Sequence, residues 1–530
     1  MSRGGPGRGR RGRRGRRDAQ PGTAREAVEA LLREELEGRG FRASLELEAA
    51  RTAEEAEAAP GRRRDLTGLP TFTVDPATAR DFDDAVSASR EDDGVRLWVH
   101  IADVAAHVRP GSRLDSEARD RGNSTYVPGA VEPMLPRALS EEACSLAPGA
   151  ERLAVTAEIE LGANGRVRSA AFYRSRIRSD ARLDYDQLDV IFSGRVEPPP
   201  EVSEPLSVAR EAAAALGERR GTTSLDVESF EPEFRFDGAG DVIGARAVVQ
   251  TESHRLIERL MILTNEQVAG LLERRRVPTV YRVHPPPDSS RVEQLIEQLD
   301  ALGIPTPPIG QGLAPSQAAE VAAEASRLVT REAARRGHGR QAYTSLVLRS
   351  LQQARYSEQN SGHAGLGSAA YCHFTSPIRR YPDLLVHRAL LAALGEEEAP
   401  PGAAEVREAA WHCSERERES MRIERAADDI CSAFLLEREL RARRTDPTFQ
   451  GEISGVIRSG AFVSFAGELG DVYEGFLPVR RIDVGRLELN ETQTALTGPD
   501  LRLRLGDPIS VGVGRVEAAR GRIDLEWRRG

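Results

Sequence analysis

Apolar positions near the start of the chain follow a helical period. Four of them recur at helical spacing: Val28, Leu31, Leu32 and Leu36. This spacing predicts an amphipathic helix over residues 23–39, because such positions share one face of a helix. Residues 41–47 read as a strand, and residues 49–63, rich in Ala and Glu and then in Arg, read as a linker. The Arg/Gly-rich residues 1–20 predict a disordered tail.

A long region with mixed periodicity follows, over residues 64–445. Residues 95–101 alternate apolar and polar side chains, as a half-buried strand does. Residues 254–272 and 343–359 carry the helical period instead. The presence of both patterns predicts a large domain of mixed α+β class.

The last part of this region, residues 402–444, predicts one long helix. Its inward stripe follows steps of three or four residues through Val406, Ala410, Cys413, Glu417 and Met421. Glu417 is therefore expected to face inward, where a carboxylate needs a partner or a function.

Short strands separated by glycine replace the helical pattern over residues 446–530. About 80 residues of this kind suit a small closed barrel of the OB-fold type. Phe462 and Phe465 lie in one of these strands, where exposed aromatic rings could stack on nucleic-acid bases. The sequence leaves open whether the two side chains bind bases or fill the barrel core.

Composition places these elements in a multidomain protein without a membrane span. The 530 residues are 39% hydrophobic, enough for a large core and more than one domain. No apolar run approaches the length of a bilayer-crossing helix. The N-terminal residues lack the apolar stretch of a secretory signal, and the four cysteines show no zinc-type spacing. We therefore expect free thiols and a cytoplasmic protein.

The charge is unevenly distributed along the chain. The net charge is −9, yet residues 1–17 contain eight arginines and no acidic residue, so the rest of the chain is near −17. Lysine is absent, and all 74 basic residues are arginine, whose planar group binds phosphate through two hydrogen bonds at once. This balance argues against a protein that coats duplex nucleic acid, but it is compatible with a locally basic channel for nucleic acid.

Four aspartates fall within ten residues, at Asp75, Asp81, Asp83 and Asp84. Carboxylates this close repel one another unless a cation lies between them, and oxygen-only ligand sets suit Mg²⁺. A solvated acidic turn is the alternative. The apolar residues on both sides of the cluster favour a metal site at the end of buried strands.

A second constellation lies in residues 373–383, with the sequence His-Phe-Thr-Ser-Pro-Ile-Arg-Arg-Tyr-Pro-Asp. A helix is predicted over residues 384–394, with Pro382 in its first turn. The positive end of this helix, together with Arg379 and Arg380, would bind a phosphate group. A surface arginine pair bound to acidic residues is the alternative. Carboxylates for a metal and cations for a phosphate are together what phosphoryl transfer requires.

The two constellations strongly resemble motifs of the ribonuclease II and RNase R family of exoribonucleases. Ordered matches continue along the chain at residues 98–104, 121–128, 134–136, 181–185, 256–265, 281–284 and 412–418. The C-terminal barrel likewise resembles the S1 domain of that family. The resemblance implies an RNB catalytic domain over residues 64–445 and an S1-like OB-fold over residues 446–530.

The resemblance also implies a Mg²⁺-dependent 3′→5′ exonuclease, with Mn²⁺ as an alternative ion, that degrades single-stranded RNA to nucleoside 5′-monophosphates. It makes the four aspartates the metal ligands, with Asp83 the acid that catalysis tolerates losing least, and Arg379 the catalytic arginine. The implied RNA contacts are Tyr126, which stacks on the terminal nucleotide, Tyr185 and Glu258 near the 3′ end, and Glu417 further out.

The chain departs from the family pattern in two places. Residues 21–63 form a short helical segment and linker, too few and too helical for one of the cold-shock barrels that family members carry before the catalytic domain. A second aromatic residue that stacks on RNA is expected within residues 225–230, but none matches clearly. The expected partner is single-stranded RNA, and the expected state is a monomer.

Two-metal-ion hydrolysis is the mechanism we expect. Asp75 and Asp84 would hold one ion at the scissile phosphate, and Asp81 and Asp83 would help to hold the other, which lowers the pKa of the attacking water. Asp83 and Asp84 would point to opposite faces of a straight strand, so the sequence predicts irregular backbone there. A non-catalytic RNA-binding protein and a phosphoesterase for small molecules are the alternatives.

Overall fold

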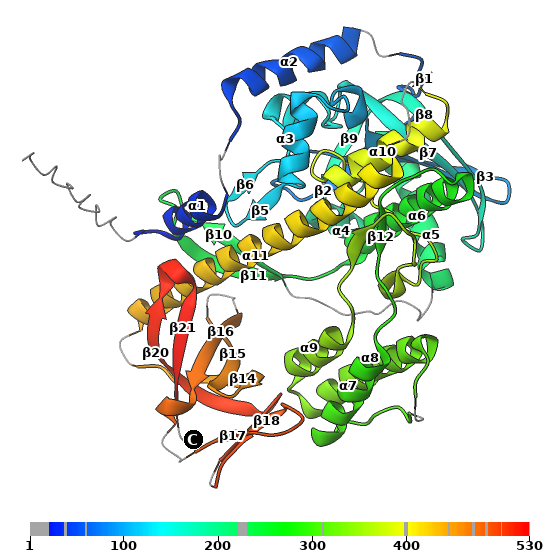
Figure 1. Ribbon diagram of the computed structural model, residues 1–530. Helices are drawn as coiled ribbons and strands as arrows, with labels where there is room; N and C mark the ends of the chain where they lie inside the picture. The colour runs from blue at the N-terminus through cyan, green and yellow to red at the C-terminus, as the bar shows by residue number, and fades with distance from the viewer. Residues whose placement is uncertain are drawn as a thin grey trace, which may run out of the picture.

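A computed structural model describes residues 21–36, 40–58, 61–220, 231–309, 312–396, 401–443, 446–468, 472–482, 486–499 and 501–528 of the chain. It shows a large α+β body, a small barrel near the C-terminus and a group of three helices beside the barrel (Figure 1). The predicted tail over residues 1–20 and the segment 225–230 lie outside the described residues. No helix among the described residues is both long and apolar enough to cross a membrane.

A seven-stranded sheet forms the centre of the large body. Its order is β1-β8-β7-β4-β3-β2-β9, and its strands are β1 (Arg64–Asp65), β2 (Phe72–Asp75), β3 (Asp84–Glu91), β4 (Gly94–Ala102), β7 (Glu151–Gly162), β8 (Val167–Arg178) and β9 (Ala181–Asp184). The strand predicted over residues 95–101 is confirmed as β4, whose buried Leu97, Val99 and Ile101 alternate along the strand as expected.

Helices cover this sheet and close its core. They are α3 (Arg113–Arg121), α4 (Tyr185–Phe192), α5 (Ser203–Arg220), α6 (Glu252–Arg275) and α10 (Tyr381–Ala393). Strands β3 and β4 pack against α5, and β4 also contacts α6. The helix predicted over residues 254–272 is confirmed as α6, and Pro382 lies in the first turn of α10 as predicted. Three two-stranded antiparallel sheets complete the body: β5 (Thr125–Val127) with β6 (Ala130–Glu132), β10 (Glu231–Phe236) with β11 (Val242–Val248), and β12 (Tyr281–Val283) with β13 (Arg355–Ser357).

The N-terminal segment is more helical than predicted. Helix α1 (Ala24–Glu35) forms where a helix was predicted, but residues 41–47 do not form a strand and residues 49–63 are not all linker. Helix α2 (Ala43–Ala58) spans both, because Leu45 and Ala49, four residues apart, are buried together against the large body. The high helix propensity of these residues therefore agrees with the structure that they adopt.

A second error lies at residues 343–359. Helix α9 (Arg340–Ser350) ends earlier than predicted, and β13 begins at Arg355. Strand β13 pairs with β12, and the Tyr356 N–H donates to Ser414 Oγ at 3.0 Å. Pairing with a distant strand thus overrides the local helical period.

One long helix, α11 (Ala403–Ala442), joins the large body to the barrel, as predicted for residues 402–444 (Figure 1). The barrel is closed in the order β14-β15-β16-β21-β20, with strands β14 (Phe449–Ile457), β15 (Gly460–Ala466), β16 (Val472–Pro478), β20 (Pro508–Glu517) and β21 (Arg522–Trp527). A small sheet of β17 (Glu488–Leu489), β18 (Ala495–Thr497) and β19 (Arg502–Arg504) lies beside it. The predicted fold class, α+β with a C-terminal OB-type barrel, is confirmed.

The structure of the barrel shows whether Phe462 and Phe465 are exposed or buried. Phe465 is 2% exposed and packs between Phe449 and Tyr473, with ring centroids 4.9 and 5.6 Å away. It therefore belongs to the core and is not free to stack on bases. Phe462 is half-buried, with its ring 5.2 Å from that of Phe476.

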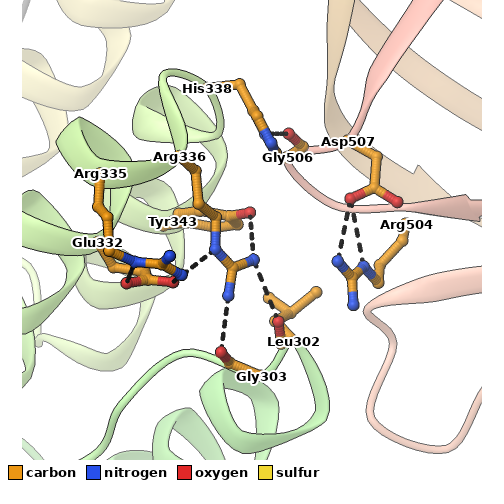
Figure 2. Close-up of polar contacts among 10 residues, drawn as sticks. All are labelled: Leu302, Gly303, Glu332, Arg335, Arg336, His338, Tyr343, Arg504, Gly506 and Asp507. Atoms are coloured by element: carbon orange, nitrogen blue, oxygen red, sulfur yellow. Dashed lines mark hydrogen bonds and ion pairs between the residues drawn. The ribbon is translucent and has the colours of Figure 1, made fainter.

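The three helices α7 (Ser289–Ala301), α8 (Pro315–Arg336) and α9 are locked to the barrel by a buried tyrosine (Figure 2). Tyr343 is fully buried, and its hydroxyl accepts a hydrogen bond from Arg336 Nη1 at 3.3 Å. Its ring lies against Gly506, which precedes β20, so closely that a Cβ at this position would overlap it. His338 Nδ1 lies 2.6 Å from the Gly506 carbonyl oxygen. Tyr343, His338 and Gly506 thus form a packed contact between the helices and the barrel, called the joint below.

Replacing Gly506 with alanine is expected to weaken this joint. Gly506 and Gly149 both have φ of +80°, but nothing lies within 4 Å of a Cβ built at Gly149. Both substitutions carry the left-handed backbone penalty of about 1–2 kcal/mol, whereas only Gly506→Ala adds an overlap with Tyr343, which typically costs about 1–3 kcal/mol more. Thermal unfolding should therefore give a lower midpoint for Gly506→Ala than for Gly149→Ala. Equal midpoints would show that the joint tolerates the extra methyl group.

Candidate active site

The acidic cluster spans the connection between two paired strands. Asp75 is the last residue of β2 and Asp84 is the first residue of β3. The strands are antiparallel, with Phe72 opposite Val86, so the end of one lies beside the start of the other. Residues 76–83 form no strand, as predicted for carboxylates that must converge. The connecting segment, residues 76–83, is called the acidic loop below.

Asp83 is the point where the two constellations meet. Its Oδ1 accepts a hydrogen bond from the Ile378 N–H at 2.8 Å, and its Oδ2 lies 3.4 Å from Arg379 Nε. The residue is 4% exposed, and Oδ2 is buried without a hydrogen-bond partner. Residues 373–383 therefore fold back onto the acidic loop, as the phosphoryl-transfer hypothesis requires.

Burial and mutual repulsion shift the pKa values of the carboxyl groups upward. Burial, reinforced by the three other aspartates, raises the pKa of Asp75 to about 8, and the charge of Arg182 opposes this shift. Burial raises the pKa of Asp84 to about 6, against the opposing charges of Arg379 and Arg380. Burial also raises the pKa of Asp83 well above its usual range. Without a cation, the cluster cannot carry its full negative charge at low energetic cost.

The residues present fit a hard divalent cation. Asp75 Oδ2 and Asp83 Oδ2 are both buried and lack hydrogen-bond partners, and oxygen is the donor atom that Mg²⁺ prefers. Within the described part of the chain, however, no three His, Cys, Asp or Glu side chains are arranged to hold a metal ion by themselves. Because Mg²⁺ keeps several waters and shares its shell with substrate phosphates, a partial protein ligand set is compatible with it. That all four aspartates bind metal stays a prediction.

The two arginines of the second constellation have different surroundings. The Arg379 side chain is 41% exposed and donates to Ser376 Oγ at 3.0 Å. Arg380 instead pairs with the fully buried Asp383, with Nη2 2.8 Å from Oδ1. The same Oδ1 accepts the Ser376 N–H at 2.8 Å. Arg379 is therefore available to a substrate, while Arg380 is engaged in holding its own loop; a phosphate contact by Arg380 stays a prediction.

Tyr126 reaches the acidic loop from the β5–β6 hairpin. Its hydroxyl donates to Asp81 Oδ2 at 2.9 Å, and its N–H donates to Glu424 Oε1 at 2.9 Å. The residue is 39% exposed. The Tyr126 hydroxyl thus contacts one of the four aspartates, and stacking of its ring on a nucleotide stays a prediction.

The remaining predicted substrate residues lie on three helices. Tyr185 is the first residue of α4, and its ring stacks on His254 with centroids 4.0 Å apart. Burial raises the pKa of Tyr185, and the negative charges of Asp84 and Asp75 add to this shift. Glu258 is exposed on α6 one turn after His254. Glu417 on α11 pairs with Arg282 at 2.6 Å, which explains its inward position.

Three side chains at this site were missed by sequence reasoning: Arg182, His254 and Glu424. Glu424 carried a signal, since it lies seven residues after Glu417 and so on the same face of α11. Arg182 lies within one of the matched motifs, residues 181–185, but only the pairing of β9 with β2 brings it to the acidic loop. The stacking of His254 on Tyr185 is a tertiary contact without a local pattern.

Comparison with known proteins identifies the family. The family model of the RNB domain matches residues 63–396. The chain belongs to the RNB domain family. Among curated relatives it is 33% identical to Ribonuclease R 1 of Lactococcus lactis subsp. lactis over 471 residues, which covers 86% of this chain and 55% of that protein. It is 34% identical to Ribonuclease R of Escherichia coli (strain K12) over 490 residues, which covers 88% of this chain and 58% of that protein. The predicted resemblance is thereby confirmed, although the chain spans little more than half of these relatives.

Solved RNB structures support the same assignment. Mycoplasma genitalium RNase R in complex with ribose methylated single-stranded RNA matches with a TM-score of 0.84 and 27% identity, over 96% of this chain and 78% of that one. The same protein in complex with double-stranded RNA matches with a TM-score of 0.79 at 27% identity, over 96% of this chain and 84% of that one. The RNB fold described above is therefore shared with these RNase R structures.

The raised pKa of Asp75 predicts a pH-dependent stability of the metal-free protein. A carboxyl with a pKa near 4 in the unfolded chain and about 8 in the folded protein binds more protons when folded, so its contribution to stability falls as pH rises between these values. In EDTA, Asp75→Asn should therefore raise the thermal midpoint relative to the unmodified protein, by an amount that grows from pH 4 to pH 8.

The control for this prediction is Asp93→Asn, whose parent side chain is 75% exposed. Its effect on the midpoint should vary little with pH. If the difference in thermal midpoint between wild type and Asp75→Asn does not change over this pH range, the raised pKa assigned to Asp75 is wrong.

Proposed function

We propose that the protein is a 3′→5′ exoribonuclease that hydrolyses single-stranded RNA from its 3′ end to nucleoside 5′-monophosphates by two-metal-ion catalysis. One observation carries the proposal. Asp83 keeps a buried Oδ2 without a hydrogen-bond partner, and this atom lies 3.4 Å from Arg379 Nε. A carboxylate oxygen for a cation thus lies beside a guanidinium for a phosphate, which is the combination that phosphoryl transfer uses.

The ions would be held by Asp75, Asp81, Asp83 and Asp84, with Mg²⁺ as the proposed ion and Mn²⁺ as the alternative. When bound, such ions lower the pKa of water and neutralise phosphate charge. Arg379 would neutralise the charge that develops on the phosphoryl oxygens, and contacts with Asp83 and Ser376 hold its guanidinium in place beforehand. A preorganised group of this kind contributes about 3 kcal/mol to the transition state.

The terminal nucleotide would be held by aromatic stacking and ribose contacts. The Tyr126 ring would stack on the last base, which fixes the position of the base without selecting its identity. Tyr185 and Glu258 would lie near the 3′ end of the RNA, and contacts to the 2′-hydroxyl would distinguish RNA from DNA. Glu417 would contact RNA further out.

The relatives support RNA as the substrate. Those described above are named Ribonuclease R, and RNase R of Mycoplasma genitalium has been solved with single-stranded and with double-stranded RNA. We further propose a monomer in the cytoplasm; the four cysteines are free thiols, as a reducing compartment allows.

The activity is tested with 5′-labelled single-stranded RNA and Mg²⁺. Stepwise shortening of the labelled strand is expected, because removal from the 3′ end leaves the label on progressively shorter products. Asp83→Asn should lower the rate by at least about 100-fold, since it removes the charge of the carboxylate that joins the acidic loop to Arg379. Asp93→Asn, a surface change of the same kind, should leave the rate unchanged.

Two outcomes of this assay would reject the proposal. Retention of the RNA without shortening would identify a binding protein. Immediate release of a labelled mononucleotide would indicate attack from the 5′ end.

Tyr126 variants separate the two contacts of this residue. Tyr126→Ala should raise KM for RNA by about 5- to 150-fold, because stacking on a base contributes about 1–3 kcal/mol. Tyr126→Phe keeps the ring and loses only the hydroxyl bond to Asp81, so its KM should stay close to wild type. Steady-state kinetics on a short labelled RNA measure both. A KM that is equally raised in both variants would assign the effect to the Asp81 contact instead of to stacking.

A further inference from the structure

Arg182 connects strand β9 to the acidic loop. It lies opposite Thr73 in the parallel β2–β9 pair, two residues before Asp75. Its Nη2 donates hydrogen bonds to the carbonyl oxygens of Pro76 at 3.1 Å and Ala77 at 2.8 Å. The guanidinium therefore holds the first two residues after the β2 strand.

The same guanidinium also reaches the far end of the loop. Its Cζ lies 5.1 Å from the centroid of the Phe82 ring, which directly precedes Asp83. Such a cation–ring contact typically contributes about 0.5–2 kcal/mol. Arg182 thus touches the loop just after Asp75 and just before Asp83, so that it spans both metal-ligand candidates.

The other hydrogen bonds to the acidic loop involve mainly its second half. Ser145 Oγ donates to the Arg80 carbonyl at 2.7 Å and accepts the Phe82 N–H at 3.1 Å. The Leu146 N–H donates to the Phe82 carbonyl at 2.9 Å. These contacts fix residues 80–82, whereas Pro76 and Ala77 are held by Arg182 and by one turn bond from the Ala79 N–H to the Pro76 carbonyl.

We propose that Arg182 is a positioning residue that clamps the acidic loop, so that Asp75 and Asp83 are held in place for a divalent cation before the cation arrives. This inference rests on the proposed function, because the metal-binding role of the aspartates belongs to it. A clamp of this kind raises metal affinity by removing part of the cost of ordering the ligands on binding.

Arg182 has a second effect of opposite sign. A positive charge close to the carboxylates repels an incoming cation, so electrostatics alone predicts that its removal strengthens metal binding. The clamp predicts that its removal weakens metal binding. The sign of the change in affinity therefore decides between the two.

The test measures Mn²⁺ binding by isothermal titration calorimetry on the full chain without RNA. Arg182→Met keeps an unbranched apolar stem and removes both the charge and the hydrogen-bond donors. We expect it to bind Mn²⁺ at least about fivefold more weakly than wild type. Arg182→Lys retains donors for the two carbonyls but lacks the planar group above Phe82, so its affinity should be intermediate.

The matched control is Arg210→Met. Arg210 lies 4.2 Å from the Phe192 ring centroid and donates to the Phe192 carbonyl at 3.4 Å, so it makes the same kinds of contact away from the acidic loop. Its Mn²⁺ affinity should stay within about twofold of wild type. Activity provides a second readout: the Mg²⁺ concentration for half-maximal RNA cleavage should rise in Arg182→Met, while the rate at saturating Mg²⁺ returns to near the wild-type value.

Mn²⁺ affinity of Arg182→Met that equals or exceeds that of wild type would overturn the proposal. If circular dichroism shows that Arg182→Met is unfolded, the same criterion is applied to Arg182→Lys. A wild-type protein that binds Mn²⁺ but does not shorten RNA would reject the proposed function, and the affinities would still decide the role of Arg182. A wild-type protein that binds no Mn²⁺ would overturn both.

Discussion

A buried carboxylate at Asp83, compensated by groups that lie 295 and 296 positions later in the chain, is the constraint on which the rest of the site depends. The Ile378 N–H and the Arg379 guanidinium offset only part of the cost of removing this charge from water, since the pKa of Asp83 is still well above its usual range. The contact joins two segments that carry complementary charges. It is therefore also the contact through which any cation bound by the aspartates would be brought to the arginine.

Much of the large body holds residues 373–383 in position for this contact. The Phe374 N–H donates to Asn265 Oδ1 of α6 at 2.9 Å, and His387 Nε2 of α10 lies 2.8 Å from the Phe374 carbonyl oxygen. Asp383 and Arg380 fix the segment from within. Because α6 and α10 belong to the same core as the central sheet, the position of Arg379 is determined by packing far from the acidic loop.

The sequence allowed the long, strongly periodic elements to be predicted, and it failed where a tertiary partner decided the outcome. Helices α6 and α11, strand β4 and the barrel each repeat one period over many residues. Residues 355–357 share the helical period of α9 but pair with β12, and residues 43–47 form the start of α2, which packs Leu45 and Ala49 against the large body. The aspartates and Arg379 were identifiable by their chemistry, whereas His254 and Arg182 act through neighbours that only the fold supplies.

The three arginines around the cluster show why residue type alone does not assign a role. Arg379 is partly exposed beside Asp83, whereas Arg380 forms an ion pair with the buried Asp383. Arg182 donates to two backbone carbonyls and lies against the Phe82 ring. All three lower the energy of nearby negative charge, but Arg379 is the one whose side chain is 41% exposed and bonded neither to backbone carbonyls nor to the fully buried Asp383. All basic residues of this chain are arginine, so their charge does not distinguish their roles. The partner of each guanidinium therefore distinguishes the arginine that would contact the substrate from those that hold the site together.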